Sequence, residues 1–251
     1  MPETNESVKI KLRNVSKTFG KVIALNGLNL DIRKGDIHAI VGDNGAGKST
    51  LLNILSGVHS PSSGEIYYNN NLVEFSSPSE ARDSGIETVY QDLALMNDLD
   101  IATNIYMGRF PTWWSFGPFR LIDWEDTYKD AKKNLEEFNQ HIDPRTEVQY
   151  LSGGQRQLVA IIRSLLFDPE VLILDEPTSA LSVAGTQLVH DTMNRLKMEG
   201  KTQIVVDHNI DEVLNIADRI SVMYQGEIVD TVYPKNENKS TISKLLATGT
   251  K

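Results

Sequence analysis

The chain has 251 residues, 40% of them hydrophobic, so it can bury a full core as one large domain or as a core domain carrying a subdomain. Its 34 acidic and 25 basic residues leave a formal net charge of -9, which provides no cationic surface for a phosphate backbone and argues against nucleic acid as a partner. The absence of cysteine excludes a disulfide framework and any thiolate metal site. Residues 1–7 do not resemble a signal peptide, and no apolar run approaches the roughly 20 residues of a spanning helix.

The first part of the chain predicts a strand, then a second strand, a glycine-rich loop and a helix. Residues 8–12 alternate between apolar and lysine side chains, which is typical of a strand with one wet face. Residues 37–41 are mostly apolar and predict a buried strand that ends at Gly42. A helical stripe through residues 51–55 then stops at Gly57. The order of buried strand, glycine loop and helix is the context in which such a loop binds phosphate.

The loop itself has the spacing GxxxxGKS. Its glycines let backbone N–H groups converge on the β- and γ-phosphates of a nucleotide, and the N-terminus of the following helix adds a positive dipole end. Lys48 is expected to neutralise phosphate charge and Ser49 to bind Mg²⁺. The alternative is a glycine turn beside a surface lysine. The candidate nucleotide-binding residues of this loop are Gly42, Asp43, Asn44, Gly45, Ala46, Gly47, Lys48, Ser49 and Thr50.

Later segments predict further strands and amphipathic helices. Short apolar runs predict strands at residues 86–90, 171–174, 203–206, 220–223 and 227–229. Three-four spacing predicts helices at residues 124–138, 158–166 and 186–199, and a short one at residues 242–247. Asp123 is placed to cap the first of these helices, and Gly200 to end the third. Residues 92–168 look mostly helical and lie between strands of one sheet, which predicts an inserted helical subdomain.

An acidic pair, Asp175 and Glu176, follows the run at residues 171–174. That run is apolar throughout, as expected for a central strand buried on both faces, and open α/β sheets place their ligands at the carboxyl ends of such strands. Asp175 would hold Mg²⁺, largely through water, and Glu176 would orient and polarise an attacking water. A strand end followed by a turn is the structural alternative.

The segment Leu-Ser-Gly-Gly-Gln at residues 151–155, together with the phosphate loop and the acidic pair, resembles the nucleotide-binding subunit of ATP-binding cassette transporters. The resemblance covers about residues 8–233. It implies an α/β fold with a P-loop NTPase, RecA-like core, an antiparallel β subdomain and an inserted α-helical subdomain. Residues 1–251 would form a single cassette, with the nucleotide-binding core at 1–91 and 169–235, the helical signature subdomain at 92–168 and a C-terminal tail at 236–251.

In this family the Leu-Ser-Gly-Gly-Gln segment closes over ATP bound to the opposite subunit, so the resemblance implies a homodimer. The side chain of Ser152 and the backbone of Gly153 and Gly154 would form a second anion-binding site at a helix start. Without the resemblance, the same residues are merely a flexible helix cap. The candidate residues are Ser152, Gly153, Gly154 and Gln155.

Three more positions match the family, and a fourth departs from its commonest pattern. Gln91 falls at the glutamine that contacts Mg²⁺ and water, with an exposed loop amide as the alternative. His208 falls at the histidine that contacts the γ-phosphate, although a lone histidine at a strand end can be structural. Phe19 matches the aromatic that stacks on adenine, with core packing as the alternative. Ser182 stands where many members have aspartate, which puts the inter-subunit contact of that aspartate in doubt.

A cluster of aromatic side chains follows Gln91 in the sequence. Large apolar groups in a loop suggest a docking surface, and in this family a coupling helix of the permease lies in this neighbourhood. Alternatively the rings pack the core of the helical subdomain itself. The cluster comprises Phe110, Pro111, Trp113, Trp114, Phe116, Pro118 and Phe119.

Three segments, residues 41–45, 85–95 and 208–213, resemble the branch of the family that imports ribose, galactose, xylose or fructose. This resemblance implies an ATPase that uses ATP and Mg²⁺. It would be a peripheral protein on the cytoplasmic side of the cell membrane, driving an integral membrane permease that an extracytoplasmic solute-binding protein serves. Import of amino acids or another small solute, a soluble non-transport cassette ATPase and a non-catalytic nucleotide sensor are the alternatives. The sequence shows no long coiled-coil insertion, basic surface or second cassette, which disfavours the non-transport ATPase.

Overall fold

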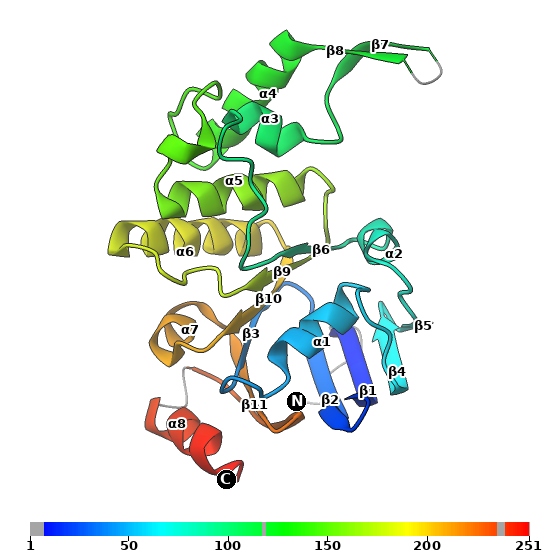
Figure 1. Cartoon of the computed structure of the whole chain (residues 1–251). Helices are drawn as coiled ribbons and strands as arrows, with labels where there is room; N and C mark the ends of the chain where they lie inside the picture. The colour runs from blue at the N-terminus through cyan, green and yellow to red at the C-terminus, as the bar shows by residue number, and fades with distance from the viewer. Residues whose placement is uncertain (1–7, 117–118, 235–238, 251) are drawn as a thin grey trace. The chain divides into compact units, whose positions relative to one another are not determined.

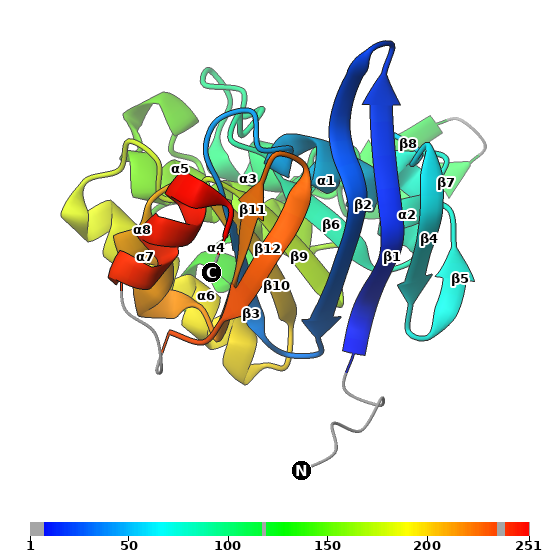
Figure 2. The same cartoon turned by 90° about the horizontal axis from the view of Figure 1, so that it is seen from below.

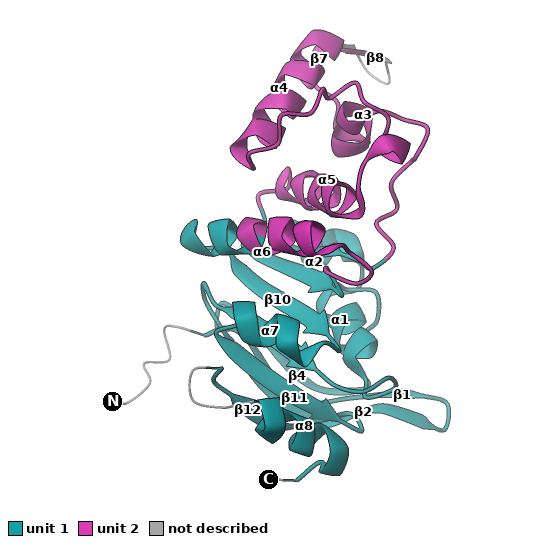
Figure 3. Cartoon of the chain, turned by 90° about the vertical axis from the view of Figure 1, so that its left-hand side faces the viewer, with its two compact units in different colours: residues 1–91, 169–177, 193–251 teal, residues 92–168, 178–192 magenta. Residues whose placement is uncertain are grey.

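The computed structural model describes residues 8–116, 119–234 and 239–250, so Pro118, residues 1–7 and the start of the predicted tail at 236–238 lie outside the described part. The chain, drawn in Figure 1, divides into two compact units, which Figure 3 shows in different colours. Unit 1 comprises residues 1–91, 169–177 and 193–251, and unit 2 comprises residues 92–168 and 178–192. Within the described residues, no helix is both long and apolar enough to cross a membrane.

Unit 1 is built on a six-stranded sheet with the order β12-β11-β3-β10-β9-β6. Its pairings are parallel except that between β11 and β12. Because β3, β9 and β10 are parallel neighbours, their carboxyl ends meet at one edge of the sheet. The strands are β3 (Ile37–Val41), β6 (Ile86–Val89), β9 (Val171–Asp175), β10 (Thr202–Asp207), β11 (Arg219–Tyr224) and β12 (Glu227–Val232).

Helices cover both faces of this sheet, because successive side chains of each strand point to opposite sides. On β3, Ile40 joins the apolar cluster that contains α1, whereas Ala39 and Val41 join the cluster formed with α7 and α8. All five residues of β3 are buried, which explains why four of them are apolar, with His38 the exception. The helices of unit 1 are α1 (Lys48–Leu55), α2 (Pro78–Asp83), α7 (Ile210–Ile216) and α8 (Lys239–Thr248).

A second, antiparallel sheet of unit 1 has the order β2-β1-β4-β5 (Figure 2). Its inner side chains belong to the same core cluster as α1. The strand predicted at residues 8–12 continues much further, because register shifts between β1 and β2 interrupt the alternation that marks a strand in the sequence. The strands are β1 (Val8–Phe19), β2 (Val22–Arg33), β4 (Ser63–Tyr68) and β5 (Asn71–Val73).

Unit 2 is mainly helical and has its own apolar core. The predicted cap of α4 is confirmed, since Asp126 N donates to Asp123 Oδ1 over 2.9 Å. A two-stranded hairpin, β7–β8, interrupts a segment that we expected to be mostly helical. The elements are α3 (Ile101–Tyr106), β7 (Thr112–Phe116), β8 (Phe119–Ile122), α4 (Trp124–Glu137), the 3-10 turn η2 (Val148–Tyr150), α5 (Gly153–Leu165) and the first part of α6 (Val183–Met198).

Candidate functional site

The glycine-rich loop connects β3 to α1, as the sequence predicts. Gly47 adopts a φ of 107°, and a Cβ there would lie 2.5 Å from Ala24 O, so only glycine fits this position. A Cβ on Gly42 would likewise lie 2.6 Å from the carbonyl oxygen of Met223. The close packing of the loop on neighbouring backbone therefore accounts for two of its glycines.

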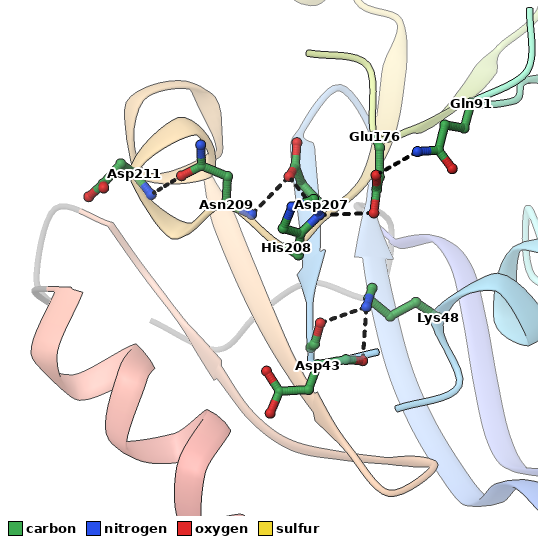
Figure 4. Close-up of polar contacts among 9 residues, drawn as sticks. Asp43, Lys48, Gln91, Glu176, Asp207, His208, Asn209 and Asp211 are labelled. Carbon is green, nitrogen blue, oxygen red and sulfur yellow. Dashed lines mark hydrogen bonds and ion pairs between the residues drawn. The ribbon is translucent and has the colours of Figure 1, made fainter. Parts of the chain in front are cut away.

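Lys48 is the first residue of α1 and is buried. Its ammonium Nζ donates to Gly42 O over 2.6 Å and to Asp43 O over 3.0 Å (Figure 4). Ser49 is exposed in the first turn of α1 and Thr50 is half-buried behind it. The loop therefore presents a lysine, a hydroxyl and a helix N-terminus together, which suits an anionic ligand.

Glu176 follows the last residue of β9 and has an unusual backbone conformation, with a φ of 46°. Its backbone N–H donates to Val206 O over 2.8 Å, which ties it to β10. Gln91 Nε2 donates to Glu176 Oε2 over 2.9 Å, and His208 Nδ1 lies 2.9 Å from Glu176 Oε1 (Figure 4). Three predicted site residues from the ends of three strands thus meet around one carboxylate.

A hollow of about 480 Å³ lies against this carboxylate. Its lining includes side chains from the phosphate loop and from the strand ends, so both parts of the predicted site open into the same space. Gly45 adopts a φ of 85°, and Ala46 is buried in the same loop. The lining residues are Asp43, Asn44, Gln91, Glu176 and His208.

Negative charge accumulates at the bottom of the site. Burial raises the pKa of Asp175 above its usual value, and the neighbouring Glu176 raises it further, while Lys48 lowers it. Asp207, at the end of β10, also has a raised pKa because it is buried. Burial lowers the pKa of Lys48, and the charge of Glu176 opposes this shift. A divalent cation would relieve the repulsion among these carboxylates.

The predicted metal ligands fit Mg²⁺ by their chemistry. Ser49, Gln91 and Asp175 offer a hydroxyl, an amide oxygen and a carboxylate, the hard oxygen donors that Mg²⁺ prefers. In the described part of the chain, no three His, Asp or Glu side chains form a ready-made metal cage. Mg²⁺ commonly takes one or two protein ligands together with substrate phosphates, so this donor set remains suitable.

The Leu-Ser-Gly-Gly-Gln segment lies in unit 2, at the start of α5. Ser152 N donates to Gln155 Oε1 over 2.9 Å, and Gln155 N donates to Ser152 Oγ over 3.3 Å, which makes a complete capping box. A Cβ on Gly154 would lie 2.6 Å from the Cα of Gly185 in α6, so this glycine is needed for close packing. Gly153 follows Ser152 in the first turn, and its Cβ would meet only the end of the Leu181 side chain, at 2.8 Å.

Two further positions have clear structural settings. Phe19 ends β1 and is 44% exposed, so it is not plain core filler. Ser182 Oγ accepts a hydrogen bond of 3.2 Å from Gly185 N, which caps the start of α6. Aspartate caps helices as well as serine does, so the departure at this position leaves the local fold intact.

The aromatic cluster divides in the structure. Phe110 packs with Trp124, their ring centroids 5.5 Å apart, against the core of unit 2. Trp113 is 68% exposed and Trp114 is 46% exposed, so neither fills that core. Phe116 is the last residue of β7 and Phe119 is the first residue of β8 in the hairpin. A role of Trp113 and Trp114 in docking stays a prediction.

Sequence reasoning missed Asp207, although this residue follows the strand predicted at 203–206 just as Asp175 follows the strand at 171–174. Asn209 N donates to Asp207 Oδ1 over 2.8 Å, and Asn209 in turn caps α7 through Asp211 N (Figure 4). His208 therefore lies in a tight turn between a buried carboxylate and a capped helix.

A phosphate loop between a buried strand and a helix, with acidic strand ends beside it, defines the class of P-loop nucleotide-binding proteins. Residues 25–179 match the family model described as ABC transporter, and the chain belongs to this family. The resemblance noted in the sequence is thereby confirmed.

Curated relatives agree with this assignment. The xylose/arabinose import ATP-binding protein of Sulfolobus acidocaldarius is 40% identical over 238 residues, which cover 94% of this chain and 93% of that protein. Other relatives, named as ribose, galactose or xylose import ATP-binding proteins, are longer, and the chain spans 42% to 47% of their length.

Solved structures confirm the predicted fold class. A nucleotide-free ATP-binding cassette from an ABC transporter superposes with a TM-score of 0.79 at 28% identity, covering 96% of this chain and 95% of that one. A dimeric ATP-binding cassette in a post-hydrolysis state, bound to ADP and Pi, gives a TM-score of 0.72 at 28% identity, covering 90% of this chain and 98% of that one.

Proposed function

We propose that this chain is the ATP-hydrolysing subunit of an ABC importer for a monosaccharide and that it works as a homodimer. The observation that carries the catalytic part is the placement of Glu176, bonded by Gln91 and facing His208, in the same hollow as the phosphate loop. The names of the relatives, which include xylose, arabinose, ribose and galactose importers, support the substrate class.

In this proposal the phosphate loop binds the triphosphate. Lys48 Nζ exchanges the carbonyl oxygens of Gly42 and Asp43 for phosphate oxygens, which costs little because both sets of acceptors lie at the same loop. The helix α1 begins at the same loop, so its N-terminus adds the positive end of the helix dipole there. Phe19 takes the base at the far end of the nucleotide.

Glu176 acts on the water that attacks the γ-phosphate. Its carboxylate accepts a hydrogen bond from Gln91 and faces His208, so its rotamer is held while its oxygens remain acceptors for a water proton. The hydrogen bond from its backbone to Val206 O keeps the unusual φ in place. His208 is close enough to the hollow to donate a hydrogen bond to the γ-phosphate.

Ser49, Gln91 and Asp175 would hold Mg²⁺ with the phosphates. When bound, the ion supplies positive charge that neutralises the phosphate oxygens and the crowded carboxylates Asp175 and Asp207. Ser152, Gly153, Gly154 and Gln155 would complete the site of the partner subunit, the capping box holding their helix start open to a phosphate.

The proposed role in an importer implies two further partners. An integral membrane permease would receive the motion of the dimer, and an extracytoplasmic solute-binding protein would deliver the sugar to that permease. The chain would then lie on the cytoplasmic side of the membrane as a peripheral protein. The exposed Trp113 and Trp114 are the candidate contacts with the permease.

Replacing Glu176 with Gln tests the catalytic assignment. The amide keeps the size of the side chain and can still accept a hydrogen bond from Gln91, but it cannot take a proton, so hydrolysis should fall about a hundredfold or more while ATP binding persists. Phosphate release and equilibrium ATP binding are the two measurements. Glu199→Gln, at an exposed position just after α6, is the matched control and should hydrolyse ATP at the wild-type rate. Wild-type turnover in Glu176→Gln would contradict the assignment.

Uptake of labelled solutes tests the substrate class. Disruption of the gene in its host should abolish uptake of one of xylose, arabinose, ribose or galactose and leave amino acid uptake unchanged. Loss of amino acid uptake alone would replace the monosaccharide with the alternative solute class, while the ATPase assignment would stand.

A further inference from the structure

The ring of Phe19 lies at the end of β1, where half-exposed aromatic side chains usually have several rotamers open to them. A ring that must be ordered when a base stacks on it weakens binding, because its conformational entropy is lost at that moment. The neighbours of Phe19 therefore matter, because they determine how far the ring is already ordered before a nucleotide binds.

Lys17 contacts the ring from the same strand. Its Nζ lies 5.2 Å from the ring centroid, within the range of a cation–π interaction. Residues two apart on a strand share a face, which places the two side chains together. The ammonium is itself anchored, because it donates to Ser60 O over 2.6 Å. Lys17 thus covers part of the ring from a fixed position.

His59 contacts the ring from a different part of the chain. The two ring centroids are 5.3 Å apart and their planes meet at 69°, an edge-to-face arrangement. His59 follows the turn that ends α1, and Gly57 in that turn adopts a φ of 74° with no room for a Cβ, which would lie 2.4 Å from Ser77 O. The position of His59 is therefore tied to the helix that begins at the phosphate loop.

The segment that carries His59 is also bound to the end of β1. Ser62 N donates to Ser16 O over 2.8 Å, and Thr18 N donates to Ser62 Oγ over 3.1 Å. These bonds involve Ser16 and Thr18, close to Phe19 in the same strand. The segment and the strand end are thus joined by hydrogen bonds, and Phe19 contacts both Lys17 and His59 while 44% of the residue remains exposed.

We infer that His59 and Lys17 are positioning residues that hold the Phe19 ring for a nucleobase. Through His59, the contact for the base is then fixed to α1, the same helix that begins at the phosphate loop. The inference rests on the proposed function, because it takes Phe19 as the base contact. Neither residue needs to touch the nucleotide. Their removal should weaken the binding of a ligand that has a base and leave unchanged the binding of one that has only phosphates.

The test compares ATP with inorganic triphosphate, both with Mg²⁺, by calorimetric titration of the whole chain. His59→Ala should weaken ATP binding about two- to tenfold, the worth of one edge-to-face aromatic contact. Lys17→Met should weaken it about two- to fivefold. His59→Phe, which restores a ring edge, should recover the wild-type affinity. Lys21→Met removes an exposed charge beyond the end of β1 and should change neither affinity.

Triphosphate affinity should stay at the wild-type value in all of these variants. An equal loss for ATP and triphosphate would overturn the inference, since it would mean that the substitutions disturb the fold or the phosphate loop. Unchanged ATP affinity in His59→Ala would overturn it as well. A wild-type chain that binds both ligands but never hydrolyses ATP would contradict the proposed function alone, because this comparison depends only on binding.

Discussion

The buried ammonium of Lys48 stabilises its own loop and is also the candidate ligand contact for phosphate. Its ammonium is buried and bonded to two carbonyl oxygens of its own loop, and burial lowers its pKa while surrounding carboxylates oppose the shift. A buried cation with a small set of acceptors gains most from a ligand that supplies stronger, anionic acceptors. Triphosphate oxygens are acceptors of this kind.

Lys48→Ala should therefore weaken ATP binding about ten- to a hundredfold, the usual worth of hydrogen bonds to a charged group. Titration with a fluorescent ATP analogue measures the change. Lys133→Ala, at an exposed position on α4, is the control and should bind as the wild type does. If Lys48→Ala retained full affinity with an unchanged unfolding midpoint, the phosphate loop would not be the nucleotide site.

The residue-scale geometry goes beyond what the sequence predicts at Glu176. Its φ of 46° is a conformation that non-glycine residues seldom adopt, and it persists because the backbone bond to Val206 O and the side-chain contacts with Gln91 and His208 hold it. Strand-end reasoning predicted the place of Glu176 at the ligand edge of the sheet, and the family resemblance placed Gln91 and His208 at the nucleotide. Neither contained a signal for the backbone strain.

At the scale of elements, the cap of α5 separates two roles of Ser152. Its hydroxyl closes the capping box with Gln155, and the same hydroxyl would face a phosphate of the partner's ATP. Ser152→Asp keeps a good cap but places a negative charge where that phosphate should bind. Ser152→Ala removes the cap and adds no charge.

We therefore expect Ser152→Ala to be the less stable of the two variants and Ser152→Asp to be the less active one. Ser152→Ala should lose about 1 kcal/mol of unfolding free energy and keep part of its ATPase activity. Ser152→Asp should keep wild-type stability and lose hydrolysis. Urea unfolding and phosphate release measure the two properties. Full hydrolysis by Ser152→Asp would remove this segment from the site.

A chain of polar side chains runs from β3 through β11 to β12 in the six-stranded sheet. His38 Nε2 lies 2.8 Å from Ser221 Oγ, which lies 2.8 Å from Thr231 Oγ1, and His38 Nδ1 has no hydrogen-bond partner among the described residues. Burial lowers the pKa of His38 from 6.5 to about 4. Above pH 6.5 the imidazole is neutral in both states, whereas below it the unfolded chain takes up a proton that the folded chain excludes.

Stability should therefore fall as the pH drops from 6.5 toward 4, by up to roughly 3 kcal/mol from this group. Urea unfolding at pH 7 and pH 5 should show a larger loss for the wild type than for His38→Gln, which keeps a polar contact to Ser221 without titrating in this range. Equal losses in the two proteins would show that the pKa of His38 does not differ between the folded and unfolded states.

The elements differ in how well the sequence predicts them, for physical reasons. The bounds of β3 were predicted correctly, because a strand buried on both faces is mostly apolar and this one lies between Asp36 and Gly42. The hairpin β7–β8 was missed, since its aromatic and proline residues show no clean alternation. The contact between Phe19 and His59 joins segments far apart in the chain, and no local pattern reports such a pairing.

At the scale of the whole molecule, the proposal is that each nucleotide site is completed by a second copy of the chain. The phosphate loop and Glu176 lie in unit 1, and the Ser152 segment lies in unit 2. The dimeric cassette with bound ADP and Pi, to which this chain is similar, supports the proposal that the halves meet across two subunits. The assignment of the two units as a nucleotide-binding core and a signature subdomain is part of the same proposal.

Mixing two inactive variants tests this proposal most directly. Lys48→Ala damages the phosphate loop and Ser152→Asp damages the segment offered to the partner, so each homodimer should be inactive. A mixed dimer keeps one intact site, formed by Lys48 of one chain and Ser152 of the other. An equal mixture should therefore recover about a quarter of the wild-type rate, since half of random dimers are mixed and each has one of two sites. If the mixture hydrolyses ATP no faster than the two variants do separately, the site is not shared between subunits.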